Sequence, residues 1–288
     1  MNGAPRGPAL VVLAAGLGTR FGGDKQTTPL GPAGATLMEY TIYDALQSGF
    51  TRIVLVVREA MREAMQSSLE RWLRGRASAE CVVQERDPSR PKPWGTAHAV
   101  LAAAHAVGTP FAVVNADDVY GRAPFTALAS FLRAARAMAP PEYALVGFPL
   151  RDTLTEAGAV NRAVCATDAL GMVTRIVERS GLTRAAAAAE GILDAPVSMN
   201  LWGFTPEIFG QLAAGFTSFT RAHGADVNAE FLLPTAVQTL IDGGAARVRL
   251  LPAPGSWCGV TYPADAPRVS AELAARVARG EYPRDLWA

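Results

Sequence analysis

The sequence predicts an α/β protein with a mostly parallel central sheet, helices on both faces of that sheet, and an antiparallel lobe. Through the first half of the chain, short runs rich in Val, Ile and Leu alternate with longer helical segments, as in parallel strands joined by helical crossovers. In the second half, two adjacent strand patterns flank a short turn, as in an antiparallel hairpin. With 288 residues and no low-complexity linker, residues 1–288 are expected to form one domain with halves 1–150 and 151–288.

The first half follows the alternation through five strands. Strands are predicted at residues 9–14, 52–57, 80–84, 110–115 and 143–148. Helices are predicted between them at residues 36–47, 59–73, 96–106 and 122–138. Because ligands of such sheets bind at the carboxyl ends of the strands, a binding site is expected beside the segments that follow the strands.

The second half changes character at the predicted hairpin, residues 159–167 and 172–178. Further strands are predicted at residues 197–204 and 247–251. Helices are predicted at residues 206–213, 229–241 and 264–279, and the alanine run at 185–189 is expected to be a short surface helix. This half should therefore pack on the first as a mixed lobe closed by a helix.

Composition narrows the class of protein. The formal net charge is +1, which argues against a nucleic-acid scaffold and against binding to an anionic membrane. No apolar run reaches membrane-spanning length, and the chain enters its first strand too early for a signal peptide. The three cysteines are scattered, so they are expected to be buried thiols in a reducing compartment, which predicts a cytoplasmic location. Oligomeric state stays open.

A glycine-rich loop directly after the first strand is built to hold phosphates. Residues 13–26 read Leu-Ala-Ala-Gly-Leu-Gly-Thr-Arg-Phe-Gly-Gly-Asp-Lys-Gln. Its glycines let backbone N–H groups approach an anion, while Arg20 and Lys25 add positive charge. The loop is not a P-loop, since Asp24 stands at the lysine position, nor a dinucleotide fingerprint, since Phe21 replaces the third glycine.

An acidic pair follows the predicted strand 110–115. Asp117 and Asp118 offer hard oxygen ligands suited to Mg²⁺ beside a phosphate site. The alternative is a turn or helix-capping role before the helix that begins at Arg122. Asp117 is the preferred metal ligand, with Asp118 as the fallback.

The connection at residues 85–94 is long and proline-rich. It carries Arg86, Arg90 and Lys92 and ends at Trp94. Two readings stay open: a basic lid over pyrophosphate, or a solvated loop.

These motifs together resemble the sugar-phosphate nucleotidylyltransferases. The loop matches their Leu-Ala-Ala-Gly-x-Gly-Thr-Arg signature followed by a lysine, and the chain closely resembles a bacterial subgroup of NDP-sugar pyrophosphorylases. That subgroup shares Gly-Gly-x-Lys-Gln, Lys-Pro-Trp-Gly-Thr-Ala-His-Ala and Met-Asn-x-Trp-Gly-Phe with this chain. The resemblance runs through nearly the whole chain. It implies a Rossmann-like three-layer nucleotidyltransferase fold with an antiparallel sugar-binding lobe.

The resemblance also implies roles for individual residues. Arg20 and Lys25 would be catalytic, holding the triphosphate and bridging phosphates at the reacting centre. The nucleotide would lie against Leu13, Ala14, Ala15, Gly16, Gly18, Thr19, Gln84, Gly95 and Thr96. The sugar would contact Gly158, Glu178, Asn200 and Glu230. At the family's second metal ligand this chain has Thr261, and Asp265, a few residues on, is the candidate replacement.

The expected reaction joins an NTP, UTP or dTTP, to a sugar 1-phosphate with Mg²⁺ as cofactor, giving an NDP-sugar and pyrophosphate. Gln84 would read the pyrimidine edge, since its amide offers one donor and one acceptor. Transfer to a non-sugar phosphate, such as an alditol phosphate, phosphocholine or the molybdenum cofactor, is the alternative. A catalytically silent NDP-sugar-binding regulator is a further one, which the retained Arg20, Lys25 and Asp117 disfavour. A nicotinamide dehydrogenase is disfavoured by Phe21.

Overall fold

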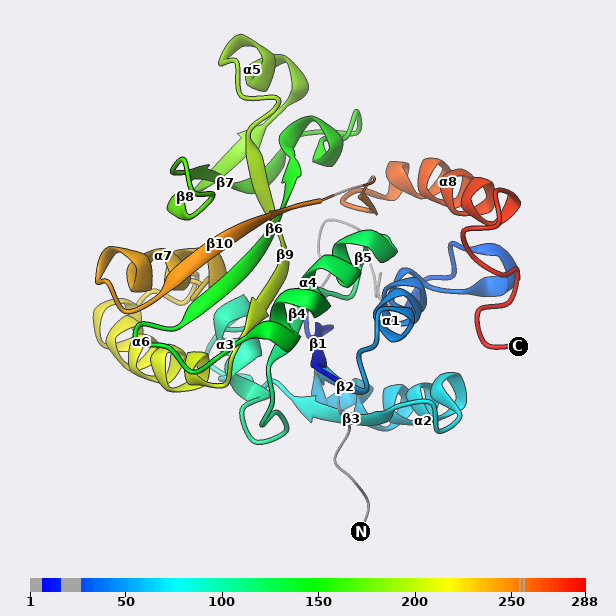
Figure 1. Cartoon of the computed structure of the whole chain (residues 1–288), viewed down its shortest axis with the longest axis horizontal. Coiled ribbons are helices and arrows are strands. Elements are labelled where there is room, and N and C mark those ends of the chain that lie inside the picture. Colours follow the sequence, from blue (N-terminus) through cyan, green and yellow to red (C-terminus); the bar gives the residue numbers. More distant parts are fainter. Residues whose placement is uncertain (1–6, 17–26, 254, 256) are drawn as a thin grey trace.

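The structure is a computed structural model that describes residues 7–16, 27–253, 255 and 257–288. Within these residues, nine strands form one sheet whose main order is β10-β6-β9-β4-β1-β2-β3 (Figure 1). The strands of this order are β1 (Ala9–Leu13), β2 (Arg52–Val57), β3 (Ser78–Val83), β4 (Phe111–Asn115), β6 (Glu142–Pro149), β9 (Pro196–Phe204) and β10 (Arg247–Pro252). The predicted α/β class is confirmed.

Strand direction sets where the functional edge lies. β1 pairs in parallel with β2 and β4, β2 with β3, and β6 with β10. β9 lies between β4 and β6 and runs antiparallel to both. The start of β9 therefore meets the carboxyl ends of β4 and β6, where ligands of parallel sheets bind.

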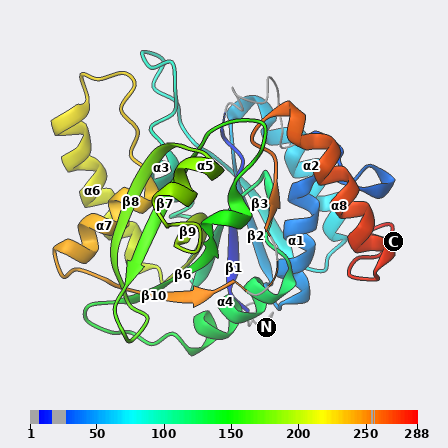
Figure 2. The same ribbon diagram turned by 90° about the horizontal axis from the view of Figure 1, so that it is seen from above.

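Helices cover both faces, as the pattern of alternation predicted. One face packs against α1 (Leu37–Gln47), α2 (Arg62–Leu73), α4 (Arg122–Ala134) and α8 (Ala266–Ala278). The other packs against α3 (Thr96–Ala102), α6 (Glu207–His223) and α7 (Leu233–Asp242). Figure 2 shows these two groups on opposite sides of the strands. Successive β1 residues alternate between the two cores, with Leu10 and Val12 in one and Ala9 and Val11 in the other.

The second half builds a lobe on β9. The hairpin β7 (Val160–Thr167) and β8 (Val173–Leu182) joins the sheet through pairing of β7 with β9. In Figure 1 this hairpin and α5 (Arg184–Ala189) project together from one end of the molecule. The predicted antiparallel hairpin and short alanine helix are both confirmed.

Several predicted boundaries differ from the structure. The predicted helix at 96–106 ends at Ala102, and the one at 206–213 continues to His223. The one at 229–241 begins only at Leu233, because residues 226–231 pair with the segment around Trp94 instead. A two-stranded ribbon, β5 (Asp118–Val119) with β11 (Cys258–Gly259), was not predicted, because strands this short carry no pattern.

The remaining features agree with the sequence. Cys81, Cys165 and Cys258 are free and buried, as expected. In the part of the chain that the structure describes, no helix is both long enough and apolar enough to cross a membrane.

Candidate active site

A hydrogen-bonded turn closes the carboxyl end of β4. The Asn115 side chain donates through Nδ2 to Oδ2 of Asp118 at 2.8 Å. The Tyr120 hydroxyl donates to the main-chain oxygen of Met199 at 2.8 Å and accepts from the Asn115 N–H at 3.0 Å. Residues 115–120 are thereby fixed against the start of β9.

The two predicted metal ligands lie in different environments within this turn. Asp118 is 4% exposed, and its main-chain oxygen accepts a hydrogen bond from the Thr41 hydroxyl. Asp117 is only half-buried. A carboxylate that reaches the surface of the strand end fits a metal held mainly by substrate phosphates, because Mg²⁺ in such sites keeps one or two protein carboxylates. In the described ranges no group of three or more His, Cys, Asp or Glu side chains gathers at one metal position. The ligand assignments of Asp117 and Asp118 stay predictions.

A β-bulge places Asn200 beside this turn. The pairing of Val113 with Trp202 sets Asn115 opposite Asn200, and the Asn200 Nδ2 donates to Asn115 Oδ1 at 3.1 Å. The β6–β9 register shifts between Leu145 and Gly147, across from Asn200, whose φ is +59°. Asn tolerates this left-handed conformation better than most residues. The bulge marks where β9 leaves β4 and begins to pair with β7.

A polar cavity of about 140 Å³ opens next to the bulge. Cross-strand register aligns Glu178 of β8 with Ala163 of β7, and Ala163 with Ser198 of β9, in one row. The lining consists of Thr96, Asn115, Asn161, Arg162, Ala163, Glu178, Ser198, Met199, Asn200, Leu232 and Pro234. The predicted residues Thr96, Glu178 and Asn200, which are far apart in the sequence, therefore meet here.

The charge inside the cavity is mixed. Desolvation raises the pKa of the Glu178 carboxyl, although much of that side chain remains solvent accessible, and the nearby positive charge of Arg162 opposes the rise. The Arg162 guanidinium donates to the Thr153 main-chain oxygen at 2.6 Å. A carboxyl, a guanidinium and three asparagine amides offer both donors and acceptors, which suits a hydroxyl-rich ligand bearing an anion.

Gln84 directly follows β3, the last strand in the main order of the sheet, and is 6% exposed. Its Nε2 donates to the Gly95 main-chain oxygen at 3.1 Å and lies 3.2 Å from Nδ1 of His98. Burial lowers the pKa of His98, opposed by the charge of Glu85, so the neutral ring is favoured. A predicted base-contacting residue is therefore already held by two fixed partners.

The start of α3 is fastened to the segment before α7. Gly95 has φ +106°, and a Cβ there would lie 2.7 Å from the main-chain oxygen of Phe231. The Phe231 N–H donates to the Trp94 oxygen at 2.6 Å, and the Thr96 hydroxyl accepts from the Leu233 N–H at 2.9 Å. Only glycine fits at residue 95, because both its backbone conformation and the space around it exclude a side chain.

The proline-rich connection at residues 85–94 is anchored through Arg90, although most of its residues are exposed. Arg90 is 2% exposed, donates to the Asp226 main-chain oxygen at 3.0 Å, and stacks over Trp94 at 3.6 Å from its ring centroid. Arg86 donates to the Arg90 main-chain oxygen at 3.0 Å. For Arg90, both the basic lid and the solvated loop are wrong, because its guanidinium is hydrogen-bonded to the backbone of residues 226–229.

Three predicted site residues of the second half, Asp265, Gly158 and Glu230, lie outside the cavity lining. Asp265 is 4% exposed; its Oδ2 accepts from the Thr261 and Tyr262 N–H groups at 2.9 Å each. The Asp265 carboxylate thus stabilises the turn at residues 261–265 by accepting hydrogen bonds from its backbone. Its role as a metal ligand stays a prediction, which this geometry does not favour. Gly158 packs where a Cβ would lie 2.9 Å from the Tyr262 ring, and the exposed Glu230 carboxylate lies 3.9 Å from Lys92.

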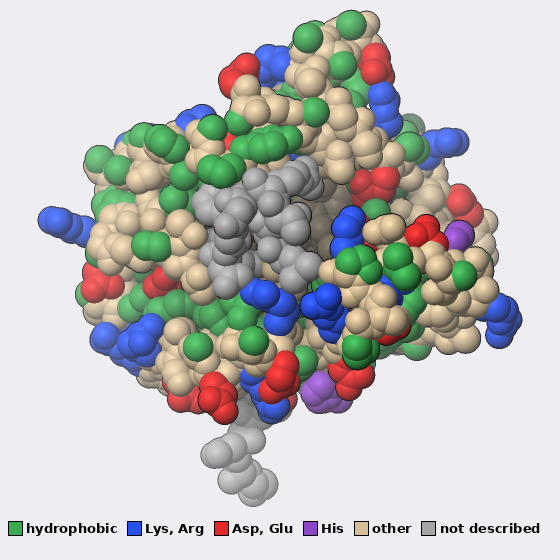
Figure 3. All heavy atoms as spheres, turned by 180° about the vertical axis from the view of Figure 1, so that it is seen from behind, with side chains coloured by type: hydrophobic (Ala, Val, Ile, Leu, Met, Phe, Trp, Pro, Cys, Tyr) green, Lys and Arg blue, Asp and Glu red, His purple; other side chains and the backbone are tan. Residues whose placement is uncertain are grey.

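The structure describes only the start of the glycine-rich loop. Leu13 accepts through its main-chain oxygen from the Ala116 N–H at 3.1 Å, and the Ala14 N–H donates to Val56 at 2.8 Å. Ala15 is buried and Gly16 exposed. The predicted residues Gly18, Thr19, Arg20 and Lys25 lie outside the described residues. Seen from behind, the surface is hollowed beside the atoms drawn in grey, with Lys and Arg side chains along its margin (Figure 3).

Sequence reasoning missed part of the cavity lining. Asn115 was noticed only as a neighbour of the acidic pair, and Asn161, Arg162 and Ser198 were not singled out. They enter the site through strand pairing across β7, β8 and β9, and a single sequence carries no signal for that register.

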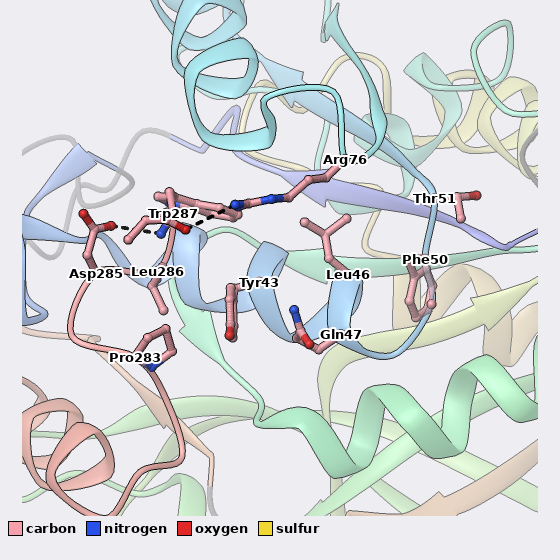
Figure 4. Close-up of a pocket in the computed structure, with 12 residues that line it drawn as sticks. Tyr43, Leu46, Gln47, Phe50, Thr51, Arg76, Pro283, Asp285, Leu286 and Trp287 are labelled. Atoms are coloured by element: carbon pink, nitrogen blue, oxygen red, sulfur yellow. Dashed lines mark hydrogen bonds between the residues drawn. The ribbon is translucent and has the colours of Figure 1, made fainter.

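A larger cavity, of about 520 Å³, lies elsewhere, between α1 and the C-terminal segment (Figure 4). Trp287 stacks on Trp72 at 6.4 Å and donates through Nε1 to the Glu39 carboxylate at 2.9 Å. Arg76 donates to the main-chain oxygen of Ala288 at 3.3 Å. This cavity shares no residue with the lining of the polar cavity, so size does not identify the site.

Comparisons with known proteins concern the sequence of the chain and its fold. Residues 10–150 match the family model described as the MobA-like NTP transferase domain. Over 191 residues, 64% of the chain, the sequence is 33% identical to the bifunctional protein GlmU of Anaeromyxobacter sp. strain K. The GlmU of Anaeromyxobacter dehalogenans is equally similar over 190 residues. The chain spans only about 35% of the length of these curated relatives.

Solved structures match nearly the whole chain. The inositol-1-phosphate CTP transferase from T. maritima superposes with a TM-score of 0.64 at 16% identity, covering 95% of this chain and 98% of that one. A UDP-glucose pyrophosphorylase in complex with UDP-glucose gives 0.62 at 16% identity, covering 92% and 97%. At such identities the likeness concerns the fold. The described chain therefore has a nucleotidyltransferase fold, and its first half matches the MobA-like NTP transferase domain.

Proposed function

We propose that this protein transfers a nucleotidyl group from UTP or dTTP to a sugar 1-phosphate, releasing pyrophosphate and an NDP-sugar. One observation carries the proposal: the polar cavity of Glu178 and Asn200 opens directly beside the acidic turn at the end of β4. A polar pocket next to the expected phosphate site supports transfer to a phosphorylated polyol. The match of residues 10–150 to an NTP transferase domain supports the same reaction.

In this reaction an oxygen of the acceptor phosphate attacks the α-phosphorus of the NTP. A new P–O bond forms, the bond to the β-phosphate oxygen breaks, and pyrophosphate leaves with that electron pair. Both reactants are polyanions, so the protein must chiefly neutralise charge and align them. Arg20 and Lys25 are proposed for the triphosphate, Glu178 and Asn200 for the acceptor hydroxyls, and Gln84 for the base.

Mg²⁺ is the proposed cofactor, with Asp117 as the ligand that reaches the surface of the turn and the buried Asp118 as the fallback. When bound, Mg²⁺ would supply charge neutralisation during the transfer. The remaining work falls to the protein: the turn fixed by Asn115 and Tyr120 holds the carboxylates in place.

A cyclic polyol phosphate is the second candidate acceptor. The observation in its favour is the fold match to an inositol-1-phosphate CTP transferase over nearly the whole of both chains. Hydroxyls of a sugar ring and of a carbocyclic polyol present the same donors and acceptors, so the cavity chemistry suits both.

The deciding experiment is a matrix of five NTPs against hexose 1-phosphates, inositol 1-phosphate and phosphocholine, with pyrophosphate release as the readout. We expect release with UTP or dTTP and a sugar 1-phosphate, dependent on Mg²⁺. Release of pyrophosphate only with inositol 1-phosphate would show that the acceptor is a cyclic polyol phosphate and not a sugar 1-phosphate. Absence of pyrophosphate release with every pair, together with tight binding of an NDP-sugar, would favour a catalytically silent regulator over an enzyme.

A further inference from the structure

The side-chain amide of Gln84 has its orientation fixed by two acceptors. Gly95 contributes a main-chain carbonyl oxygen at 3.1 Å, and a carbonyl can only accept, so the atom facing it must be the Nε2 of Gln84. The second Nε2 hydrogen points to His98 Nδ1 at 3.2 Å. Such a bond requires an unprotonated Nδ1, as in the neutral tautomer that carries its hydrogen on Nε2, and burial favours the neutral ring.

Both acceptors are themselves held in place. Gly95 cannot shift toward Phe231, because the Phe231 backbone already packs against it. The residues that flank the Gly95–Thr96 pair are also hydrogen-bonded to Phe231: its N–H donates to the Trp94 oxygen at 2.6 Å, and its oxygen accepts from the Ala97 N–H at 3.0 Å. His98 packs its ring on Phe216, with centroids 4.7 Å apart. The amide therefore has one polar atom left to offer a ligand, Oε1, and this atom can only accept a hydrogen bond.

We infer that His98 is a positioning residue for base selection, which together with the Gly95 carbonyl locks the Gln84 amide so that Oε1 faces the base. This inference rests on the proposed function. A fixed acceptor favours uracil or thymine, whose N3 carries a hydrogen, over cytosine, whose N3 is itself an acceptor. Without the lock, the amide could rotate by half a turn and present Nε2 to cytosine instead. Gln84 alone does not discriminate between uracil and cytosine, and this discrimination depends on the Gly95 carbonyl and on His98.

The test is the ratio of kcat/KM for UTP to that for CTP. His98→Phe keeps a ring against Phe216 but removes the Nδ1 acceptor, and His98→Leu serves if that variant does not fold. We expect either to reduce the ratio at least about tenfold, the size of one unpaired polar contact. His98→Asn, which can place Oδ1 near the Nδ1 position, should restore most of the ratio.

Two controls separate this role from a general structural one. His105→Leu, at an exposed histidine just after α3, should leave the ratio unchanged. Thermal unfolding of each variant should stay close to that of the unmodified protein, whereas loss of packing alone would lower the unfolding temperature without changing base preference.

The outcomes divide clearly. A UTP-to-CTP ratio in His98→Phe or His98→Leu within about twofold of the unmodified protein would overturn the inference, as would an unmodified protein without preference. If no NTP supports pyrophosphate release, the proposed function fails. The inference is then tested by equilibrium titration with UTP and CTP, where the same loss of preference is expected and its absence refutes the lock.

Discussion

The buried carboxyl of Asp44 should make stability fall as pH rises. Asp44 lies on α1 with no measurable exposure; the Tyr282 hydroxyl donates to its Oδ2 at 2.6 Å, and the Arg122 Nε lies 3.9 Å from Oδ1. Burial raises the pKa of Asp44 from 3.8 to about 7, against smaller opposing effects of Tyr282 and Arg122. The cost of desolvating the charge therefore exceeds what its neighbours return.

The pH window follows from this direction. The folded pKa lies above the unfolded one, so the contribution to stability is complete below pH 3.8 and is lost as pH rises through about 7. A rise from 3.8 to about 7 corresponds to roughly 4 kcal/mol in total, of which roughly 3 kcal/mol falls between pH 5 and pH 8.

Asp44→Asn removes the titration while keeping the shape of the side chain. Urea unfolding of both proteins from pH 5 to pH 8 measures the difference in unfolding free energy. We expect the variant to gain roughly 3 kcal/mol relative to the unmodified protein across this window. Asp152→Asn, at an exposed carboxylate, controls for a general change of charge. Parallel curves for Asp44→Asn and the unmodified protein would refute the reasoning.

Three further changes test the proposed site. Lys25→Ala should lower turnover about a hundredfold with little change in unfolding temperature, since a transition-state charge contact is lost; near-normal pyrophosphate release would remove that lysine from the mechanism. Asp117→Asn should abolish Mg²⁺-dependent release while Asp118→Asn keeps a measurable rate, and the reverse order in a Mg²⁺ titration would exchange the two roles. Gly95→Ala should destabilise the fold by at least about 1–3 kcal/mol, because residue 95 has a positive φ and a Cβ there would meet the Phe231 backbone. Chemical denaturation measures the change in unfolding free energy, and unchanged stability would contradict the described packing.

Much of the fold was predictable because its elements carry their own signals. The Val- and Ile-rich runs of the parallel strands and the helical pattern at residues 36–47 are local features, and their positions agree with the structure to within a few residues. The strand order was not predictable in the same way. β9 enters between β4 and β6 although residues 196–204 lie far from either in the sequence, and pairing over that distance leaves no local pattern.

The site divides along the same line. Glu178, Asn200 and Thr96 were identified by motif resemblance, and the structure brings them to one cavity. The lock on Gln84 was not foreseen. A lone histidine near the start of a helix is typical of a structural role. The role inferred for His98 follows only from its contact with the Gln84 amide, which the sequence does not show. Asp265 shows the opposite case, since a residue type suited to metals is engaged by backbone N–H groups.

The position of β9 has a consequence for how the chain can be divided. The sequence match to an NTP transferase domain ends at residue 150, which invites expression of that segment alone. A fragment 1–150 would lack the strand between β4 and β6, leaving β6 with no partner in the sheet and its apolar faces open to water. It would also lose the Met199 oxygen that holds the Tyr120 hydroxyl, and with it the geometry of the acidic turn. The unit that folds is therefore larger than the segment that the family model matches, and a truncation at residue 150 should yield an aggregating fragment instead of a minimal nucleotide-binding domain.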